Sequence, residues 1–143
     1  MMFRKACQAY RDYTDNKPSG YVMFLDATAS GLQILATLLG CHDTARNTNL
    51  LGGNRVDVYE MVAKRMSDIV KQDVSRDDVK KPIMTNFYGS KAQPKILFGE
   101  DTPELEAFYD VLNTELGGAV EAMNDIQSCW NPTVLAHQWT LPD

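Results

Sequence analysis

Apolar and polar residues alternate along the chain in short blocks whose spacing predicts mostly helices. The first block is predicted to be helical as far as Tyr13, and the turn-forming residues 15–20 end it. Residues 21–25 form a continuous apolar run that is typical of a short buried strand. A second helix is predicted over 30–39, where apolar residues recur at intervals of three and four and Gly40 follows as a helix end.

The second half of the chain contains two longer amphipathic patterns. Asn54 and Asp57 can cap a helix with an apolar face that begins at Val58, and this helix is predicted to end near Asp73. Thr102 before a proline signals another start, and the apolar stripe over 105–123 predicts one long helix. Together the patterns predict a predominantly α fold with one short β element, which is an α+β class.

Composition excludes several classes of protein. Of the 143 residues, 44% are apolar and 23% charged, so a packed globular core is expected. The net charge of −5 argues against a broad basic surface for nucleic acid, and the three cysteines have no metal-binding or disulfide spacing. No apolar run approaches the roughly 20 residues that cross a bilayer, and no signal core precedes the first helix. We therefore expect a cytoplasmic protein, in the host cytoplasm if the source is viral, that is neither secreted nor membrane-bound.

Asp26 is a candidate metal ligand because it follows the predicted strand directly. A carboxylate that projects from a strand end can bind Mg²⁺, a hard cation that prefers carboxylates, water and substrate phosphates. The alternative is an aspartate that merely caps the following helix. The segment taken alone favours this alternative.

Basic residues gather in a second candidate segment, residues 76–95. Lys80 and Tyr88 lie eight positions apart, or about 80° around a helix, so that both can line one side. Pro82 predicts a helix start near Asp78 or Val79, because an interior proline costs about 3 kcal/mol. Lys80 would then lie in the first turn, where the helix N-terminus attracts phosphate. The alternative is a solvated surface helix.

Two motifs together resemble motifs A and B of the single-subunit, phage-type RNA polymerases. Residues 26–33 read Asp-Ala-Thr-Ala-Ser-Gly-Leu-Gln, and residues 84–91 read Met-Thr-Asn-Phe-Tyr-Gly-Ser-Lys. Matches in residues 58–64, 120–124 and 139–143 extend the resemblance over the larger part of the chain. It implies a palm-edge segment in residues 1–40 and a helical, fingers-like region in residues 41–143.

The resemblance implies a DNA-directed RNA polymerase that uses NTP, a DNA template and two Mg²⁺ ions to extend an RNA product. Asp26 would bind both ions, and the carbonyl of Ala27 would bind one of them. The family's second catalytic aspartate, in a His-Asp-Ser sequence, is absent, so the chain is expected to be inactive alone. Its C-terminal end looks truncated, and a second polypeptide or a further segment would supply the missing aspartate.

The resemblance also implies substrate contacts. Lys80 and Arg76 would hold the triphosphate, although a helix start near Asp78 would leave Arg76 on the preceding loop. Tyr88 would lie beneath the sugar and help to recognise ribose, with Gly89 beside it in the turn.

Gly31 occupies the position at which related DNA polymerases place a glutamate that closes the space for a 2′-hydroxyl. A ribonucleotide therefore fits the sequence better than a deoxyribonucleotide. Two alternatives stay open: a polymerase-derived module that binds without catalysis, and, less favoured, a fragment of a DNA polymerase.

Overall fold

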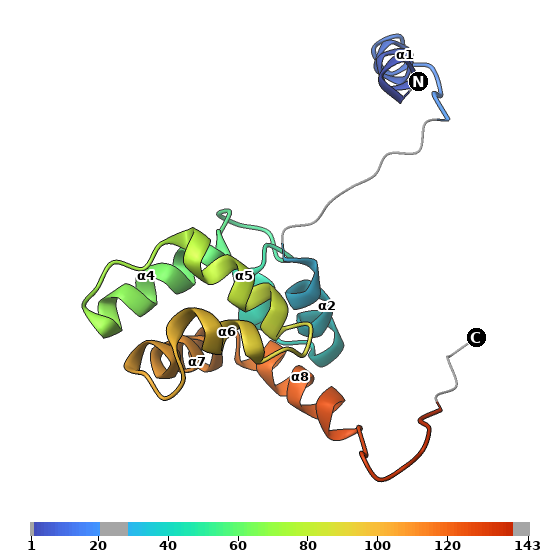
Figure 1. Ribbon diagram of the computed structural model, residues 1–143. Coiled ribbons are helices and arrows are strands. Elements are labelled where there is room, and N and C mark those ends of the chain that lie inside the picture. Colours follow the sequence, from blue (N-terminus) through green and yellow to red (C-terminus); the bar gives the residue numbers. More distant parts are fainter. Residues whose placement is uncertain (1, 21–28, 139–143) are drawn as a thin grey trace.

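Eight helices make up the regular structure of residues 2–20 and 29–138, the part of the chain that the computed structural model describes (Figure 1). In chain order they are α1 (Met2–Thr14), α2 (Ser30–Leu39), α3 (His42–Asn47), α4 (Val58–Val70), α5 (Arg76–Asn86), α6 (Ala92–Phe98), α7 (Pro103–Glu115) and α8 (Gly117–Ser128). Figure 1 shows α1 apart from the bundle formed by the others. The bundle of α2 to α8 is therefore the part of the described structure in which a functional site is sought.

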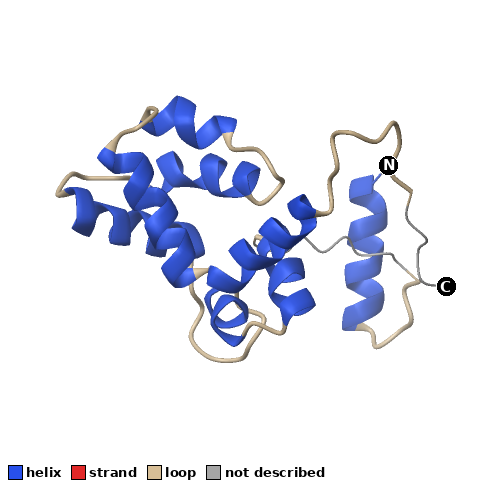
Figure 2. Cartoon of the chain, turned by 90° about the horizontal axis from the view of Figure 1, so that it is seen from below, coloured by secondary structure: helices blue, strands red, loops and turns tan. Residues whose placement is uncertain are grey.

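The predicted α+β class is wrong. The structure is 65% helix, and Figure 2 shows helices and loops but no strand in the part of the chain that is described. The predicted strand over 21–25 lies outside the described residues. A strand needs a neighbouring strand for its backbone hydrogen bonds, and residues 2–20 and 29–138 offer none to pair with. The fold class that the structure supports is all-α.

The core forms where α4 packs between α5 and α7 and where α2 packs on α8. Val62, Met66, Val79, Ile83 and Phe108 have no exposed surface. Full burial of one such side chain stabilises the fold by about 1.5–3 kcal/mol. The core therefore fixes the relative positions of α4 and α5, the two helices that later supply most of the site.

The start of α4 confirms the helix predicted after Asp57. The Asp57 carboxylate accepts hydrogen bonds from the backbone amides of Tyr59 and Glu60, at 3.0 and 3.3 Å. These bonds satisfy two of the free amides at the helix start. The helix ends at Val70, and the next residue, Lys71, adopts a left-handed conformation with φ 58°.

The start of α5 differs from the prediction. Ser75 and Asp78 form a capping box, in which each side chain accepts a hydrogen bond from the other residue's backbone amide. The helix therefore begins at Arg76 and includes Pro82 in its interior. The capping box stabilises the first turn, and Pro82 is buried against the core. Arg76 consequently lies on the helix and not on the preceding loop.

The long helix predicted over 105–123 is divided into α7 and α8 at Leu116. Two glycines follow this residue, and the second of them lies against α3. A Cβ atom on Gly118 would be 2.3 Å from Cys41 Cβ, a distance that real Cβ contacts essentially never show. The glycine pair therefore permits both the break and the close approach of α3, a short helix that the sequence pattern did not predict.

Gly118→Ala is expected to lower the free energy of unfolding by about 1–3 kcal/mol, the usual cost of overpacking. Gly117→Ala is the matched control, because a Cβ there has no neighbour within 4 Å. Urea unfolding followed by circular dichroism measures both variants. Equal stabilities for the two would show that α3 and α8 do not pack this closely.

Candidate functional site

A pocket of about 330 Å³ lies between the start of α2, the start of α4 and one side of α5. It brings together four residues that were predicted as site residues from segments far apart in the sequence: Gly31, Arg76, Lys80 and Tyr88. Asp26 and Ala27 lie outside the described residues, although Ala29, three positions after Asp26, lines the pocket. The pocket is therefore the candidate site.

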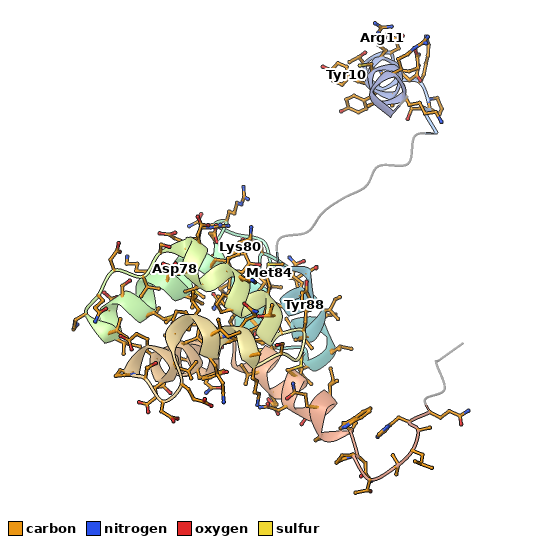
Figure 3. All side chains as sticks on the ribbon, in the orientation of Figure 1. Tyr10, Arg11, Asp78, Lys80, Met84 and Tyr88 are labelled. Atoms are coloured by element: carbon orange, nitrogen blue, oxygen red, sulfur yellow. The ribbon has the colours of Figure 1, made fainter. Side chains whose placement is uncertain are left out.

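One side of α5 provides most of the charged wall. Arg76 and Lys80 are one turn apart on this helix, and Figure 3 shows Lys80 and Met84 along it, with Tyr88 just after its end. Lys80 is exposed and forms no ion pair with any described residue. Its ammonium group is therefore available to an anion in the pocket.

The predicted position of Lys80 in the first turn is wrong. Because the capping box starts α5 at Arg76, Lys80 is the fifth helical residue and lies in the second turn. The free backbone amides of the helix start therefore do not lie at Lys80. Any attraction for phosphate comes from the side chains of Lys80 and Arg76.

Arg76 is held in place by two contacts with the start of α4. Its Nε donates to Asp57 Oδ2 at 2.8 Å, and its Cζ lies 5.3 Å from the centre of the Tyr59 ring. Burial acts to raise the pKa of Asp57, but hydrogen bonds from Arg76 and from the α4 amides outweigh it and hold this pKa below its ordinary value. Asp57 therefore stays ionised and fixes both the helix start and the guanidinium.

Asp57 and Tyr59 are contributors that the sequence analysis did not assign to the site. Tyr59 is buried beneath Arg76 and lines the pocket. Burial raises the pKa of its phenol, and nearby Tyr88 raises it further. The Tyr59 side chain is therefore a neutral wall. The sequence indicated Asp57 only as a helix cap. Nothing in the apolar pattern related it to Arg76, which follows 19 positions later in the chain.

Tyr88 and Gly31 meet at the other end of the pocket. A Cβ atom on Gly31 would lie 3.4 Å from Cε1 of Tyr88, so the glycine allows the aromatic ring to approach the α2 backbone. The ring is 66% exposed and therefore has open space on its other side. Gly89, also predicted to bind substrate, is not in the lining; its carbonyl accepts a hydrogen bond from Gln127 Nε2 at 3.4 Å.

A comparison with protein families identifies the chain. The family model described as DNA-dependent RNA polymerase matches residues 5–95, which is more than half of the sequence and includes every residue of the pocket. The chain belongs to the DNA-dependent RNA polymerase family. This confirms the resemblance to single-subunit RNA polymerases on which the motif assignment depends. A search of curated proteins found no match.

Membership of the RNA polymerase family implies interaction with nucleoside triphosphates and nucleic acid, and it suggests a divalent metal. Within residues 2–20 and 29–138, no group of three or more histidine, cysteine, aspartate or glutamate side chains could hold a metal ion. The described residues that line the pocket include no carboxylate. None of the described helices is long and apolar enough to cross a membrane.

Proposed function

We propose that the pocket binds the incoming NTP of an RNA polymerase that transfers NMP to an RNA 3′-hydroxyl as directed by a DNA template. The observation that supports this proposal is the convergence of Arg76, Lys80, Tyr88 and Gly31 on one pocket. Among the described residues, two cationic side chains and no carboxylate line it, which suits a polyanionic triphosphate. A tyrosine and a glycine lie at the opposite end, where the sugar would lie.

In this proposal Lys80 is the mobile contact to the triphosphate and Arg76 the fixed one. Arg76 keeps Nε on Asp57, which leaves its terminal nitrogens to donate to phosphate oxygens. Nη1 also lies 3.7 Å from Asp77 Oδ1, a weak pairing because that side chain is 92% exposed. Lys80, which forms no ion pair within the described part of the chain, adds a charge one turn further along α5. Hydrogen bonds of this charged type are about twice as strong as neutral ones.

Asp26 and the Ala27 carbonyl are the proposed ligands of Mg²⁺, which supplies positive charge to the attacking and leaving oxygens when it is bound. Arg76 and Lys80 orient the triphosphate, and Tyr88 and Gly31 position the ribose. Since a two-metal site needs carboxylates from two motifs, we propose that the 143-residue chain is inactive until a segment or second polypeptide with the other aspartate joins it. Residues 1–40 would then form a palm edge and residues 41–143 a fingers-like region, with Gly89 shaping the turn beside the sugar.

Gly31→Glu tests the assignment on the purified chain. The new side chain would extend beside Tyr88 and place a carboxylate in the pocket, so it is expected to abolish binding of a fluorescent ribonucleoside triphosphate with Mg²⁺. Gly52→Glu is the matched control, because it adds the same charge at a glycine with no neighbour within 4 Å. Equal affinities of the two folded variants would reject the pocket as the NTP site.

Tyr88→Phe tests the proposed ribose contact in a polymerase completed with the second aspartate. The substitution keeps the ring beside Gly31 and removes only the hydroxyl. A site that hydrogen-bonds a substrate hydroxyl disfavours substrates without it. NTP incorporation is therefore expected to persist while dNTP incorporation rises, as measured by kcat/KM for each. An unchanged ratio of the two values would limit Tyr88 to packing.

A non-catalytic binding module is the alternative function. Such a module would bind the nucleotide in the same pocket but would not catalyse its addition to RNA. Template-directed incorporation by the completed polymerase separates the two, since a binding module would bind NTP and never extend the RNA.

A further inference from the structure

The turn that follows α5 carries Tyr88 to the sugar end of the proposed NTP pocket. Phe87, at the start of this turn, is buried in the core. Beyond it, the backbone amides of Tyr88 and Ser90 both donate to the carbonyl of Thr85, which closes the turn on itself. Local hydrogen bonds of this kind fix the shape of the turn. They do not fix how closely the Tyr88 ring approaches α2.

A side chain of α8 connects this turn to a second helix. Gln127 Nε2 donates a hydrogen bond to the carbonyl of Gly89 at 3.4 Å. Gly89 has a φ of 87°, and a Cβ atom there would lie 3.5 Å from the same Nε2. Gln127 also lines a small surface pocket together with Asn86 and Lys91, which lie on either side of the turn. The amide group of Gln127 therefore lies directly against the turn that carries Tyr88.

The helix that carries Gln127 also supports the opposite wall of the sugar end. It packs on α2, the helix that contributes Gly31, and the buried alanines of α8 lie in the same core cluster as the buried leucines of α2. One helix is therefore connected to both groups at the sugar end. It reaches Gly31 through helix packing, and it reaches Tyr88 through the hydrogen bond to Gly89.

We propose that Gln127 is a positioning residue for sugar discrimination, which acts through Gly89 to hold the Tyr88 ring against the α2 backbone at Gly31. The proposal rests on the proposed function, because it assumes that the NTP ribose lies at Tyr88. Gln127 does not line the NTP pocket, so it acts through Tyr88 and not on the substrate. A site disfavours a substrate that lacks a hydroxyl only when its own hydrogen-bonding group is held in place by supporting contacts.

Competition binding on the folded full chain tests the proposal. The probe is ATP with a fluorophore on its terminal phosphate, bound in the presence of Mg²⁺, and unlabelled ATP and dATP displace it. The ratio of their two dissociation constants measures the discrimination. Gln127→Met keeps the length of the side chain and removes its donor, so it is expected to lower the preference for ATP about two- to tenfold, as the loss of one hydrogen bond predicts.

Three variants separate positioning from a general structural effect. Gln72→Met is the matched control, because Gln72 is exposed and lies outside the NTP pocket, and it is expected to keep the parent ratio. Gln127→Lys keeps a donor for the Gly89 carbonyl and is expected to restore the ratio, since its added charge strengthens binding of ATP and dATP alike. In a Tyr88→Phe background, Gln127→Met is expected to change the ratio no further, because both substitutions act on the same hydroxyl.

Hydrogen exchange of the peptide over residues 86–91, measured without nucleotide, tests the connection between α8 and the turn by itself. Exchange is expected to be faster in Gln127→Met than in Gln72→Met. Equal exchange in these two variants would overturn the proposal, as would a loss of preference that Gln127→Lys does not restore or that persists in full in the Tyr88→Phe background.

The competition experiment also distinguishes failure of this proposal from failure of the NTP site. A parent chain that does not bind the probe, or probe binding that survives Gly31→Glu, would reject the NTP site and the role of Gln127 with it. Probe binding that Gly31→Glu abolishes, with no preference for ATP in the parent or with equal ratios in Gln127→Met and Gln72→Met, would reject the role of Gln127 alone.

Discussion

Asp26→Asn is expected to abolish nucleotide addition by a polymerase in which the 143-residue chain is completed with the second aspartate. The substitution keeps the size of the side chain and removes the negative charge that a hard divalent cation requires. The described pocket lining holds no other carboxylate that could replace it. Primer extension with saturating NTP and Mg²⁺ measures the loss.

Asp73→Asn is the control for this experiment, because Asp73 is exposed and lies outside the pocket. Without the segment that carries the second aspartate, the parent chain is expected to extend no primer. Incorporation by the unaccompanied chain, or normal rates for the Asp26→Asn variant of the completed polymerase, would contradict the metal assignment.

Lys80→Ala is expected to lower kcat/KM for NTP by about 10- to 100-fold in the same completed polymerase, since a hydrogen bond to a charged group contributes about 1.5–3 kcal/mol. The structure offers a close control in Lys81. Both lysines are exposed and adjacent on α5, but only Lys80 lines the pocket. Lys81→Ala therefore removes the same charge and should change kcat/KM little.

Comparable losses of kcat/KM in Lys80→Ala and Lys81→Ala would mean that the net charge of the surface, and not a contact in the pocket, attracts the triphosphate. Raised ionic strength provides a second check. A contact between Lys80 and phosphate in the pocket is screened less by salt than a general surface attraction, so the difference between the variants should persist.

Spacing predicted the helices that have a clear apolar face and a local end signal. The helices α2 and α4 were found for this reason, and Gly40 closes the first of them in a left-handed conformation, as expected. The start of α5 differs from the prediction because the Ser75–Asp78 capping box, a signal present in the sequence, stabilises a first turn ahead of Pro82. A strand is stable only when its backbone pairs with a neighbouring strand. The apolar run of residues 21–25 contains no information about such a partner.

The site was partly predictable for a similar reason. The spacing of Lys80 and Tyr88 already predicted that they line one side. Arg76 was expected on the preceding loop, and the Ser75–Asp78 capping box places it on the helix instead. Gly31 joined them only through the resemblance to a family. The contact of Arg76 with Asp57 depends on how α4 packs against α5, and no local pattern contains that information.

Affinity labelling tests the central claim most directly. An ATP derivative with a lysine-reactive group on its terminal phosphate would be incubated with the chain and Mg²⁺, and the modified peptides would be mapped by mass spectrometry. The account predicts label on Lys80, suppressed by excess ATP and by Gly31→Glu but not by Gly52→Glu. Label that is spread equally over Lys64, Lys80 and Lys81, or that excess ATP does not suppress, would contradict the claim that this pocket binds the triphosphate.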